Sequence, residues 1–271
     1  MFGFQFRLNQ IYEKEAGNTL KDAFVFITGY SIAGLIVLLI INGPHFEFTG
    51  FSLLMAVFTA LDFIACSYFS LKAFSKVNIA LLSIFSMLGG MVLPFIVGIL
   101  FFDEGLTAAK IVCIILLIFA VCVTFEKKTK NSGLIYCFCV FFFNGMSGVL
   151  SKIFQSAPYP KTNEAVYSVM CAAVTGFIAG IFLIFIKGKK INLNKKAIAA
   201  MTGYGILNRM ANYLLLLALA VLPASVQYPF ITGGVIIVSV VIGLFTNQKP
   251  SKREIVSVIL SGLGIAALFI L

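Results

Sequence analysis

Charged residues are scarce in this sequence, where Asp, Glu, Lys and Arg make up 11% of 271 residues and hydrophobic residues make up 61%. A soluble domain has about 25% charged and about 45–50% apolar residues. A folded core of this length could not bury so much apolar surface, so the remainder must contact lipid. The composition therefore excludes an ordinary soluble domain and predicts an integral membrane protein.

Motifs for catalysis and nucleotide binding are also missing. The sequence has one histidine, His45, and no tryptophan. It lacks the G-x4-G-K-[ST] phosphate loop, the H-E-x-x-H zinc motif and any paired-aspartate motif for prenyl transfer. The six cysteines lie within apolar runs, and no His or acid accompanies the closely spaced Cys137 and Cys139, which is typical of small buried residues and not of a metal site. We therefore expect no enzymatic activity, no metal and no cofactor.

The excess of positive charge, 20 Lys and Arg against 10 Asp and Glu, lies mainly between the apolar runs. Short basic loops are typical of the cytoplasmic side of a membrane protein, whereas a nucleic-acid-binding domain gathers its basic residues on one face. We therefore predict a bacterial inner or plasma membrane protein with cytoplasmic basic loops and no nucleic-acid partner. We expect Lys152, near a helix end, to extend to the membrane surface. The basic residues assigned to the cytoplasmic loops are Lys72, Lys76, Lys127, Lys128, Lys130, Lys187, Lys189, Lys190, Lys195, Lys196, Lys249, Lys252 and Arg253.

Nine apolar runs are long enough to span a hydrocarbon core about 30 Å thick, which takes about 20 residues of α-helix. Barrel strands would be about ten residues long and would alternate in polarity, so helices are the spanning element that fits. Turn-forming residues separate the runs, as at Asn42-Gly43-Pro44, Asn131-Ser132-Gly133, Pro158-Tyr159-Pro160 and Lys249-Pro250-Ser251. Residues 1–21 contain charged residues and no complete span. The predicted spans are 22–42, 51–73, 78–102, 106–125, 133–155, 165–187, 196–220, 223–246 and 253–271.

The second half of the sequence resembles the first at an offset of 144 residues, which places Gly89-Gly90 on Gly233-Gly234. The copy in residues 133–271 has five spans. The copy in residues 1–125 has four spans and, in residues 1–10, the end of a fifth. Two five-helix copies insert with opposite orientation, which is the inverted-repeat plan of many secondary transporters. The alternative is a protein that has nine spans by design.

The fourth apolar run carries the features that connect the sequence to a family. Small residues and Pro94 precede the stretch Phe102-Asp103-Glu104-Gly105-Leu106-Thr107. This stretch resembles the glycine/glutamate/leucine/threonine turn of EamA-type repeats in the drug/metabolite transporter superfamily. The corresponding turn of the second copy, Asn247-Gln248-Lys249-Pro250-Ser251, lacks the glutamate. The resemblance implies ten spans in two inverted repeats around a central cavity, with the first helix incomplete in this sequence. Members of the family move amino acids, nucleotide sugars, metabolites or drugs.

Two ionisable residues lie in the middle of predicted spans, where a charge is costly and marks a functional site by default. Asp62 lies midway along 51–73 and Arg209 midway along 196–220, which are equivalent spans of the two copies. We hypothesise that both face one cavity, pair when it is empty and exchange that partner for substrate charge. Arginine suits this role because its planar fork can grip a carboxylate or phosphate with two hydrogen bonds. The alternative is a static ion pair that tethers the two halves.

Further polar residues lie near these two or in equivalent spans. Helical spacing of three and four residues places Asn212 and Tyr213 on the face of Arg209. Pro229 predicts a bend beside Gln227 that could line a cavity. The alternative for each is helix packing or interhelical hydrogen bonding, worth about 0.6–2 kcal/mol. The full set of candidate substrate-binding residues is Asp62, Arg209, Asn208, Asn212, Tyr213, Gln227, Tyr228, Tyr68, Ser83 and Asn144.

The sequence thus predicts an all-α integral membrane protein with nine transmembrane helices. We predict that it moves a small polar metabolite or drug-like solute across the membrane by alternating access. Its partners are a small-molecule substrate and the lipid bilayer, and a homodimer is one alternative for its oligomeric state. If transport is coupled to protons, the position of Asp62 makes it the carrier. The alternatives are a non-transporting membrane subunit, a membrane enzyme, which should show clustered acids or metal ligands at one membrane face, and a truncated inactive transporter.

Overall fold

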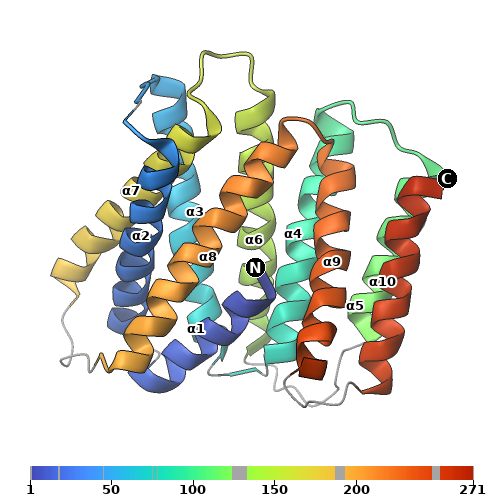
Figure 1. The fold of residues 1–271 in the computed structure, drawn as a ribbon, viewed down its shortest axis with the longest axis horizontal. Coiled ribbons are helices and arrows are strands. Elements are labelled where there is room, and N and C mark those ends of the chain that lie inside the picture. The colour runs from blue at the N-terminus through green and yellow to red at the C-terminus, as the bar shows by residue number, and fades with distance from the viewer. Residues whose placement is uncertain are drawn as a thin grey trace. The chain divides into compact units, whose positions relative to one another are not determined.

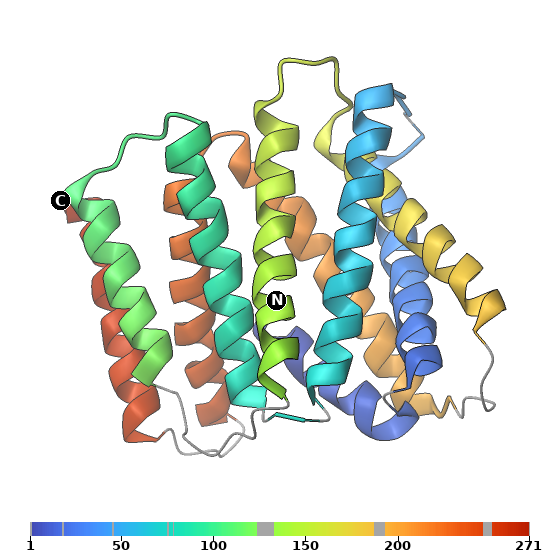
Figure 2. The same ribbon diagram turned by 180° about the vertical axis from the view of Figure 1, so that it is seen from behind.

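The computed structural model describes residues 2–17, 19–44, 46–74, 76–77, 79–123, 133–186, 193–245 and 251–270. In these residues the chain forms ten α-helices and no β-strand. Figure 1 shows the helices, and Figure 2 shows them from behind. Their bounds are α1 Phe2–Ala16, α2 Leu20–Asn42, α3 Gly50–Phe74, α4 Ile79–Phe101, α5 Ala108–Val123, α6 Leu134–Ser156, α7 Glu164–Phe185, α8 Lys195–Leu219, α9 Ala224–Phe245 and α10 Lys252–Ile270.

Nine of these helices, α2 to α10, coincide with the nine predicted runs to within two residues at each end. Five of them, α2, α3, α4, α6 and α7, are long and apolar enough to cross a membrane by length and composition. The described parts of α5, α9 and α10 include shorter apolar helices. The helical class is therefore confirmed, and a crossing by all nine stays a prediction.

The helix α1 is the main difference from the sequence-based prediction, which placed only the end of a span in residues 1–10. The structure has 15 helical residues here. The Tyr12 hydroxyl donates to the carbonyl of Asp22 at 2.9 Å, and Asn194 donates to the Glu15 carboxylate at 2.5 Å. Both contacts tie the end of α1 to the starts of α2 and α8. Hydropathy did not find the helix because α1 is polar and packs on protein along α8.

Local side-chain chemistry explains where several helices begin and end. Thr19 and Asp22 form a reciprocal capping box at the start of α2, which satisfies backbone donors that a helix end leaves free. Asn163 and Asn194 cap α7 and α8, where each side chain accepts one hydrogen bond from a backbone N–H of the first turn. The predicted turn after α2 is confirmed: Gly43 ends the helix with a φ of 66°, a conformation that glycine adopts without strain.

Some sequence-based predictions fall outside the described residues. They include most of the turns at 131–133 and 249–251 and the lone His45. The basic residues outside the described part are Lys127, Lys128, Lys130, Lys187, Lys189, Lys190 and Lys249.

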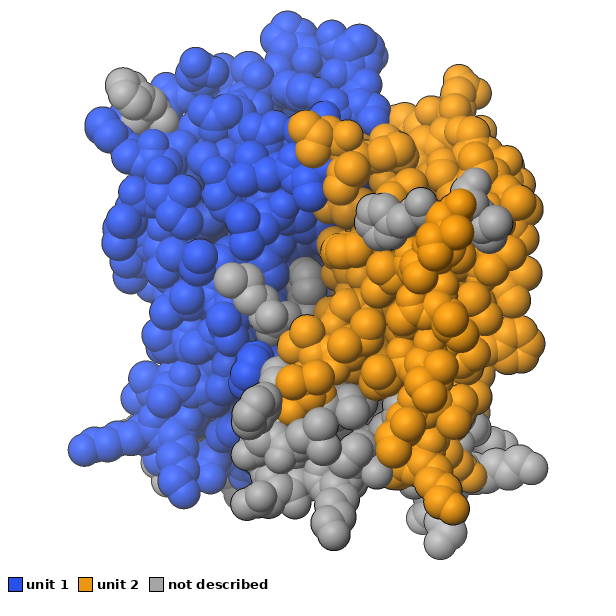
Figure 3. Space-filling view, turned by 45° about the vertical axis from the view of Figure 1, so that its right-hand side comes forward, with its two compact units in different colours: residues 1–76, 153–220 blue, residues 77–152, 221–271 orange. Residues whose placement is uncertain are grey.

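The chain divides into two compact units, which Figure 3 shows in different colours. The first consists of residues 1–76 and 153–220, and the second of residues 77–152 and 221–271. In the first unit, α2 packs on α7 and α8, α3 packs on α7, and α1 packs along α8. In the second unit, α10 packs on α5 and α9, and α4 packs on α9. Each unit draws on both halves of the sequence, so the units are a different division from the predicted repeats.

Glycines allow close backbone contact at two helix crossings. A Cβ atom at Gly205 would overlap the carbonyl of Tyr30, so α2 and α8 touch backbone to backbone in the first unit. In the second unit, a Cβ atom at Gly89 would overlap the carbonyl of Phe141, where α4 crosses α6. Small residues permit such contacts between helices in membranes.

We expect Gly89→Ala to destabilise the protein by about 1–3 kcal/mol, the usual cost of overpacking, because the obstructing atoms belong to backbone. The matched control is Gly234→Ala, where a Cβ atom would meet nothing within 4 Å. Helix propensity alone makes that change neutral or stabilising by up to about 1 kcal/mol. Thermal unfolding of both purified variants in detergent measures the difference. Equal stability of the two variants would contradict the close crossing of α4 and α6.

Candidate substrate-binding site

A buried cluster of polar side chains lies in the first unit around Arg209, a residue of α8 with 2% of its surface exposed. Its Nη2 donates to the Ser31 hydroxyl of α2 at 3.4 Å. The guanidinium also lies over two aromatic rings, with its Cζ 4.7 Å from the centroid of Phe63 and 5.7 Å from that of Tyr30. The stem of Arg209 packs against Gly34, where no larger residue would fit. Three helices, α2, α3 and α8, therefore hold one cation in a fixed position.

The cation has no carboxylate partner among the described residues. Its Nε atom is buried and has no hydrogen-bond acceptor in the part of the chain that the structure describes. Contacts with aromatic faces stabilise a cation by about 0.5–2 kcal/mol, which is small beside the cost of burying a charge. The guanidinium is therefore held by neutral groups and keeps capacity to bind an anion.

Asp62 belongs to the same cluster but does not pair with Arg209. It lies on α3 with 5% exposed surface, and neither of its carboxylate oxygens has a hydrogen-bond partner in the described part of the chain. The Tyr30 hydroxyl is within electrostatic range of both Asp62 and Arg209. The two side chains form no hydrogen-bonded pair in this structure, and their pairing in the empty protein stays a prediction. That prediction rested on the position of both residues midway along equivalent spans, which does not determine the direction in which each side chain points.

The structure adds polar residues that the sequence did not single out. On α1, Gln5 accepts a hydrogen bond of 3.0 Å from the Nδ2 of Asn208, and the Nε2 of Gln5 has no partner among the described residues. The Oδ1 of Asn9, one turn further along α1, is also buried and unpartnered there. Tyr30 and Ser67 share a hydrogen bond of 3.0 Å between α2 and α3. The spacing of four residues between Gln5 and Asn9 was the sequence feature that could have indicated a polar face on a helix here.

The remaining predicted residues of this unit are spread around the cluster. Asn212 donates to the backbone carbonyl of Asn208 at 2.8 Å, which satisfies its amide within α8. Tyr213 packs beside an apolar cluster that includes Leu38, so it contributes mainly to packing. Tyr68 packs against the large apolar core of the unit, with Lys72 above its ring. Of the predicted residues, Arg209, Asp62 and Asn208 are those most closely associated with the unpartnered polar atoms.

The other four predicted residues, Ser83, Asn144, Gln227 and Tyr228, belong to the second unit. Asn144 of α6 donates to the carbonyl of Ser86 of α4 at 2.6 Å, the interhelical bond that was the alternative to substrate binding. The Tyr228 hydroxyl donates to the carbonyl of Gly148 at 3.1 Å. Gln227 is buried, and Ser83 is half-buried. Asn144 and Tyr228 therefore have structural partners within their own unit.

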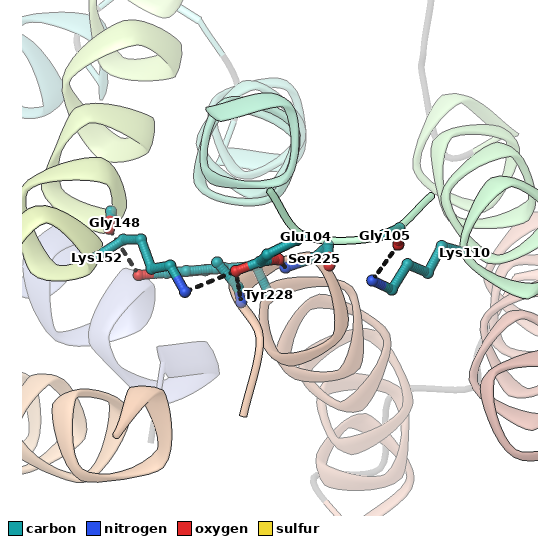
Figure 4. A network of polar contacts seen from close by, with 8 residues as sticks. Glu104, Gly105, Lys110, Gly148, Lys152, Ser225 and Tyr228 are labelled. Atoms are coloured by element: carbon teal, nitrogen blue, oxygen red, sulfur yellow. Dashed lines mark hydrogen bonds and ion pairs between the residues drawn. The ribbon is translucent and has the colours of Figure 1, made fainter. Parts of the chain in front are cut away.

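A second polar network, shown in Figure 4, surrounds Glu104 in the connection between α4 and α5. Its carboxylate forms an ion pair of 2.7 Å with the Nζ of Lys152 on α6. It also accepts hydrogen bonds from the backbone N–H groups of Ala224 and Ser225, at 2.8 and 2.7 Å. These donors belong to the first turn of α9, where the helix dipole favours a negative charge. One carboxylate thus joins α6 and α9 to the α4–α5 connection.

This network corrects the prediction for Lys152. The side chain is only 11% exposed and binds Glu104, where the sequence had predicted an extension to the membrane surface. Burial of Glu104 works to raise the pKa of its carboxyl group, but the bonds from Lys152, Ser225 and Ala224 outweigh it and lower the pKa below 4.5. The pair could not be predicted from the sequence, because its partners lie 48 positions apart and their contact depends on packing.

We expect the stabilisation by Glu104 to be fully present above its ordinary pKa of 4.5 and to be lost as the pH falls through the lower, folded-state value. The unfolding temperature of wild type should therefore exceed that of Glu104→Gln at pH 7, and the gap should narrow below pH 4.5. A gap that stays constant down to pH 3.5 would contradict the lowered pKa.

An open groove of about 480 Å³ runs between α2 and α7 on the first unit. It is lined almost entirely by apolar groups, including Ile32, Leu35 and Phe177. Ile32 and Phe177 are more than half exposed, so this groove suits contact with lipid. It therefore does not offer a binding site for a polar solute.

The described helices and their exposed apolar faces define a multi-pass α-helical membrane protein with a buried polar cluster. Residues 131–270 match the EamA-like transporter family, and the chain belongs to that family. A solved structure described only as "Crystal structure of protein" has the same fold, with a TM-score of 0.73 and 12% sequence identity. The match covers 98% of this chain and 96% of the other. A search of curated proteins gave no significant match.

Proposed function

We propose that this protein is a secondary transporter of the drug/metabolite type that moves a small polar solute carrying a carboxylate or phosphate group. The observation that supports this most directly is Arg209, a buried guanidinium without an anionic partner among the described residues. A side-on grip by guanidinium uses Nε and one Nη atom, and here Nε is unpartnered. A substrate anion would supply the missing counter-charge.

Buried amides of α1 and α8 extend the proposal to the rest of the solute. Gln5 and Asn9 lie on α1 and Asn208 on α8, and the first two retain polar atoms without a partner among the described residues. Amides can donate to and accept from hydroxyl, amine or carbonyl groups. We therefore propose that Arg209 binds the anionic group and that these amides bind a polar group elsewhere on the same solute.

The proposed mechanism is alternating access, with two inverted repeats moving around a site near the middle of the membrane. The pairing of helices in each unit supports the repeats: α2 and α3 lie with α7 and α8, and α4 and α5 lie with α9 and α10. These are the helices that the sequence offset treats as equivalent.

The orientation is proposed from charge. In the first unit, the contacts of Tyr12 and Glu15 bring the end of α1 and the starts of α2 and α8 to the same end. That end carries Lys14, Lys21 and Lys195, so we place it in the cytoplasm of a bacterial cell.

A ligand screen by thermal stabilisation of the purified protein tests the proposal. A ligand present at 100 times its Kd adds about 2.7 kcal/mol to stability. We expect stabilisation by solutes that carry a carboxylate or phosphate, and counterflow uptake of the same solutes into proteoliposomes. Hits confined to cations or uncharged compounds would refute the anionic substrate, and stabilising hits without any uptake would favour a non-transporting subunit.

A further inference from the structure

Asp62 is a buried carboxyl group that the proposed anion site does not use. It occupies the centre of α3, a helix long and apolar enough to cross the membrane, and 5% of the residue is exposed. Buried polar side chains almost always have a hydrogen-bond partner, and each exception requires an explanation. Neither oxygen of Asp62 has such a partner among the described residues. A residue that only filled space here would be apolar.

The groups around Asp62 are neutral apart from Arg209. Helical spacing places Thr59 and Cys66 on its side of α3, and Thr59 is satisfied by a bond of 2.8 Å with Tyr167 of α7. Tyr30 of α2 lies within electrostatic range of Asp62. The guanidinium of Arg209 lies 4.7 Å from the ring centroid of Phe63, the residue that follows Asp62 on α3. The described part of α1 contributes amides to the cluster. Among the residues that the structure describes, no second acid belongs to this group, and Arg209 is its permanent charge.

An ionised carboxylate without a partner is costly to bury, by several kcal/mol. Two arrangements avoid that cost. Asp62 can bind a proton, as its unpartnered oxygens in this structure allow, or it can ionise and turn to pair with Arg209. In the second arrangement Arg209 is blocked, and in the first it is open to an anion.

We propose that Asp62 is an exchangeable proton-binding site whose occupancy is controlled by Arg209. A carboxylate oxygen of Asp62 takes up one proton when Arg209 is free or holds an anion, and releases it when the two side chains pair. The coupling to transport rests on the proposed function: a proton and an anionic solute would be loaded together. The proton site itself requires no substrate.

Carbodiimide labelling tests the site in the whole purified protein. Dicyclohexylcarbodiimide modifies protonated carboxyl groups in apolar surroundings, and peptide mass spectrometry locates the adduct. We expect labelling of Asp62 at pH 6, with a rate that falls about tenfold per pH unit above the titration midpoint. Glu104 in the same sample is an internal control, because Lys152 keeps it ionised, so it should stay unlabelled.

Two variants separate a proton site from a structural carboxyl group. Arg209→Gln removes the cation that favours ionised Asp62, so labelling should persist to higher pH, whereas Arg209→Lys should keep the wild-type profile. Infrared spectroscopy provides a second readout: the carbonyl band of a protonated carboxyl group should titrate over the same range and be absent in Asp62→Asn. An Asp62 that shows neither adduct nor band, or a pH profile unchanged in Arg209→Gln, would overturn the proposal. That failure would leave the transport proposal standing, since neither measurement involves transport.

Discussion

Arg209→Gln should weaken binding of the anionic solute about 100-fold while leaving the protein as stable as wild type or more stable. Two hydrogen bonds to a charged group, at about 1.5 kcal/mol each, correspond to a loss of about 100-fold in affinity. Stability should not fall, because glutamine removes a buried cation that lacks an anionic partner in the described chain. Such opposite effects are typical of residues retained for function. Titration of the purified variant with a ligand from the stabilisation screen measures the affinity, and thermal unfolding measures the stability.

Arg209→Lys is the matched variant for this experiment. It keeps the charge but loses the planar fork, so we expect an affinity between those of wild type and Arg209→Gln. A structural role for Arg209 predicts the reverse pattern, in which Arg209→Gln unfolds at a lower temperature and binds normally once folded. Normal transport by Arg209→Gln would rule out Arg209 as the residue that binds the substrate anion.

Glu104→Gln should be among the most destabilising single changes in the second unit, at about 3 kcal/mol. The substitution removes the counter-ion of Lys152, whose side chain is 11% exposed, and weakens the acceptor for two N–H groups at the start of α9. The uncompensated lysine charge accounts for most of the cost. Thermal unfolding of the purified variant in detergent at pH 7 measures it.

Asp103→Asn is the matched control for this change, since it removes the neighbouring carboxylate of the same connection. Asp103 is exposed and has a φ of 52°, a conformation that asparagine also tolerates. We expect that variant to unfold within a degree or two of wild type. The double variant Glu104→Gln with Lys152→Met should recover part of the lost stability, because it leaves no buried charge. If both acidic substitutions had equal effects, Glu104 would be only a surface charge.

The helices themselves were predictable because lipid imposes a simple rule on them. An apolar run such as residues 22–42 must form its hydrogen bonds within itself, and Gly43 ends it. The polar helix α1 follows a different rule, since it is covered by protein and held by contacts such as Tyr12 to Asp22. Hydropathy carries no information on such contacts.

The candidate site was predictable only in part. Arg209 and Asp62 were found because a charge in a membrane helix is rare and costly. Ser31 was not found, because its type is ordinary and only the fold brings it to a charge. Gln5 was not found either, since it lies in a segment without a recognisable span. The pairing of Lys152 with Glu104 depends on three helices meeting and could not be seen in the chain order.

Each unit combines helices that are far apart in the sequence, and this has a consequence for the synthesis of the protein. In the second unit, α5 packs along α10, the last of the helices that the structure describes. About 130 residues lie between Val123 and Lys252. Because a ribosome adds about 5–20 residues per second, α10 is synthesised roughly 6–26 s after α5. During that interval its protein-facing side must be covered by lipid, by the insertion machinery or by another helix. A stop codon anywhere before α10 would leave α5 without this neighbour, however complete the earlier helices are.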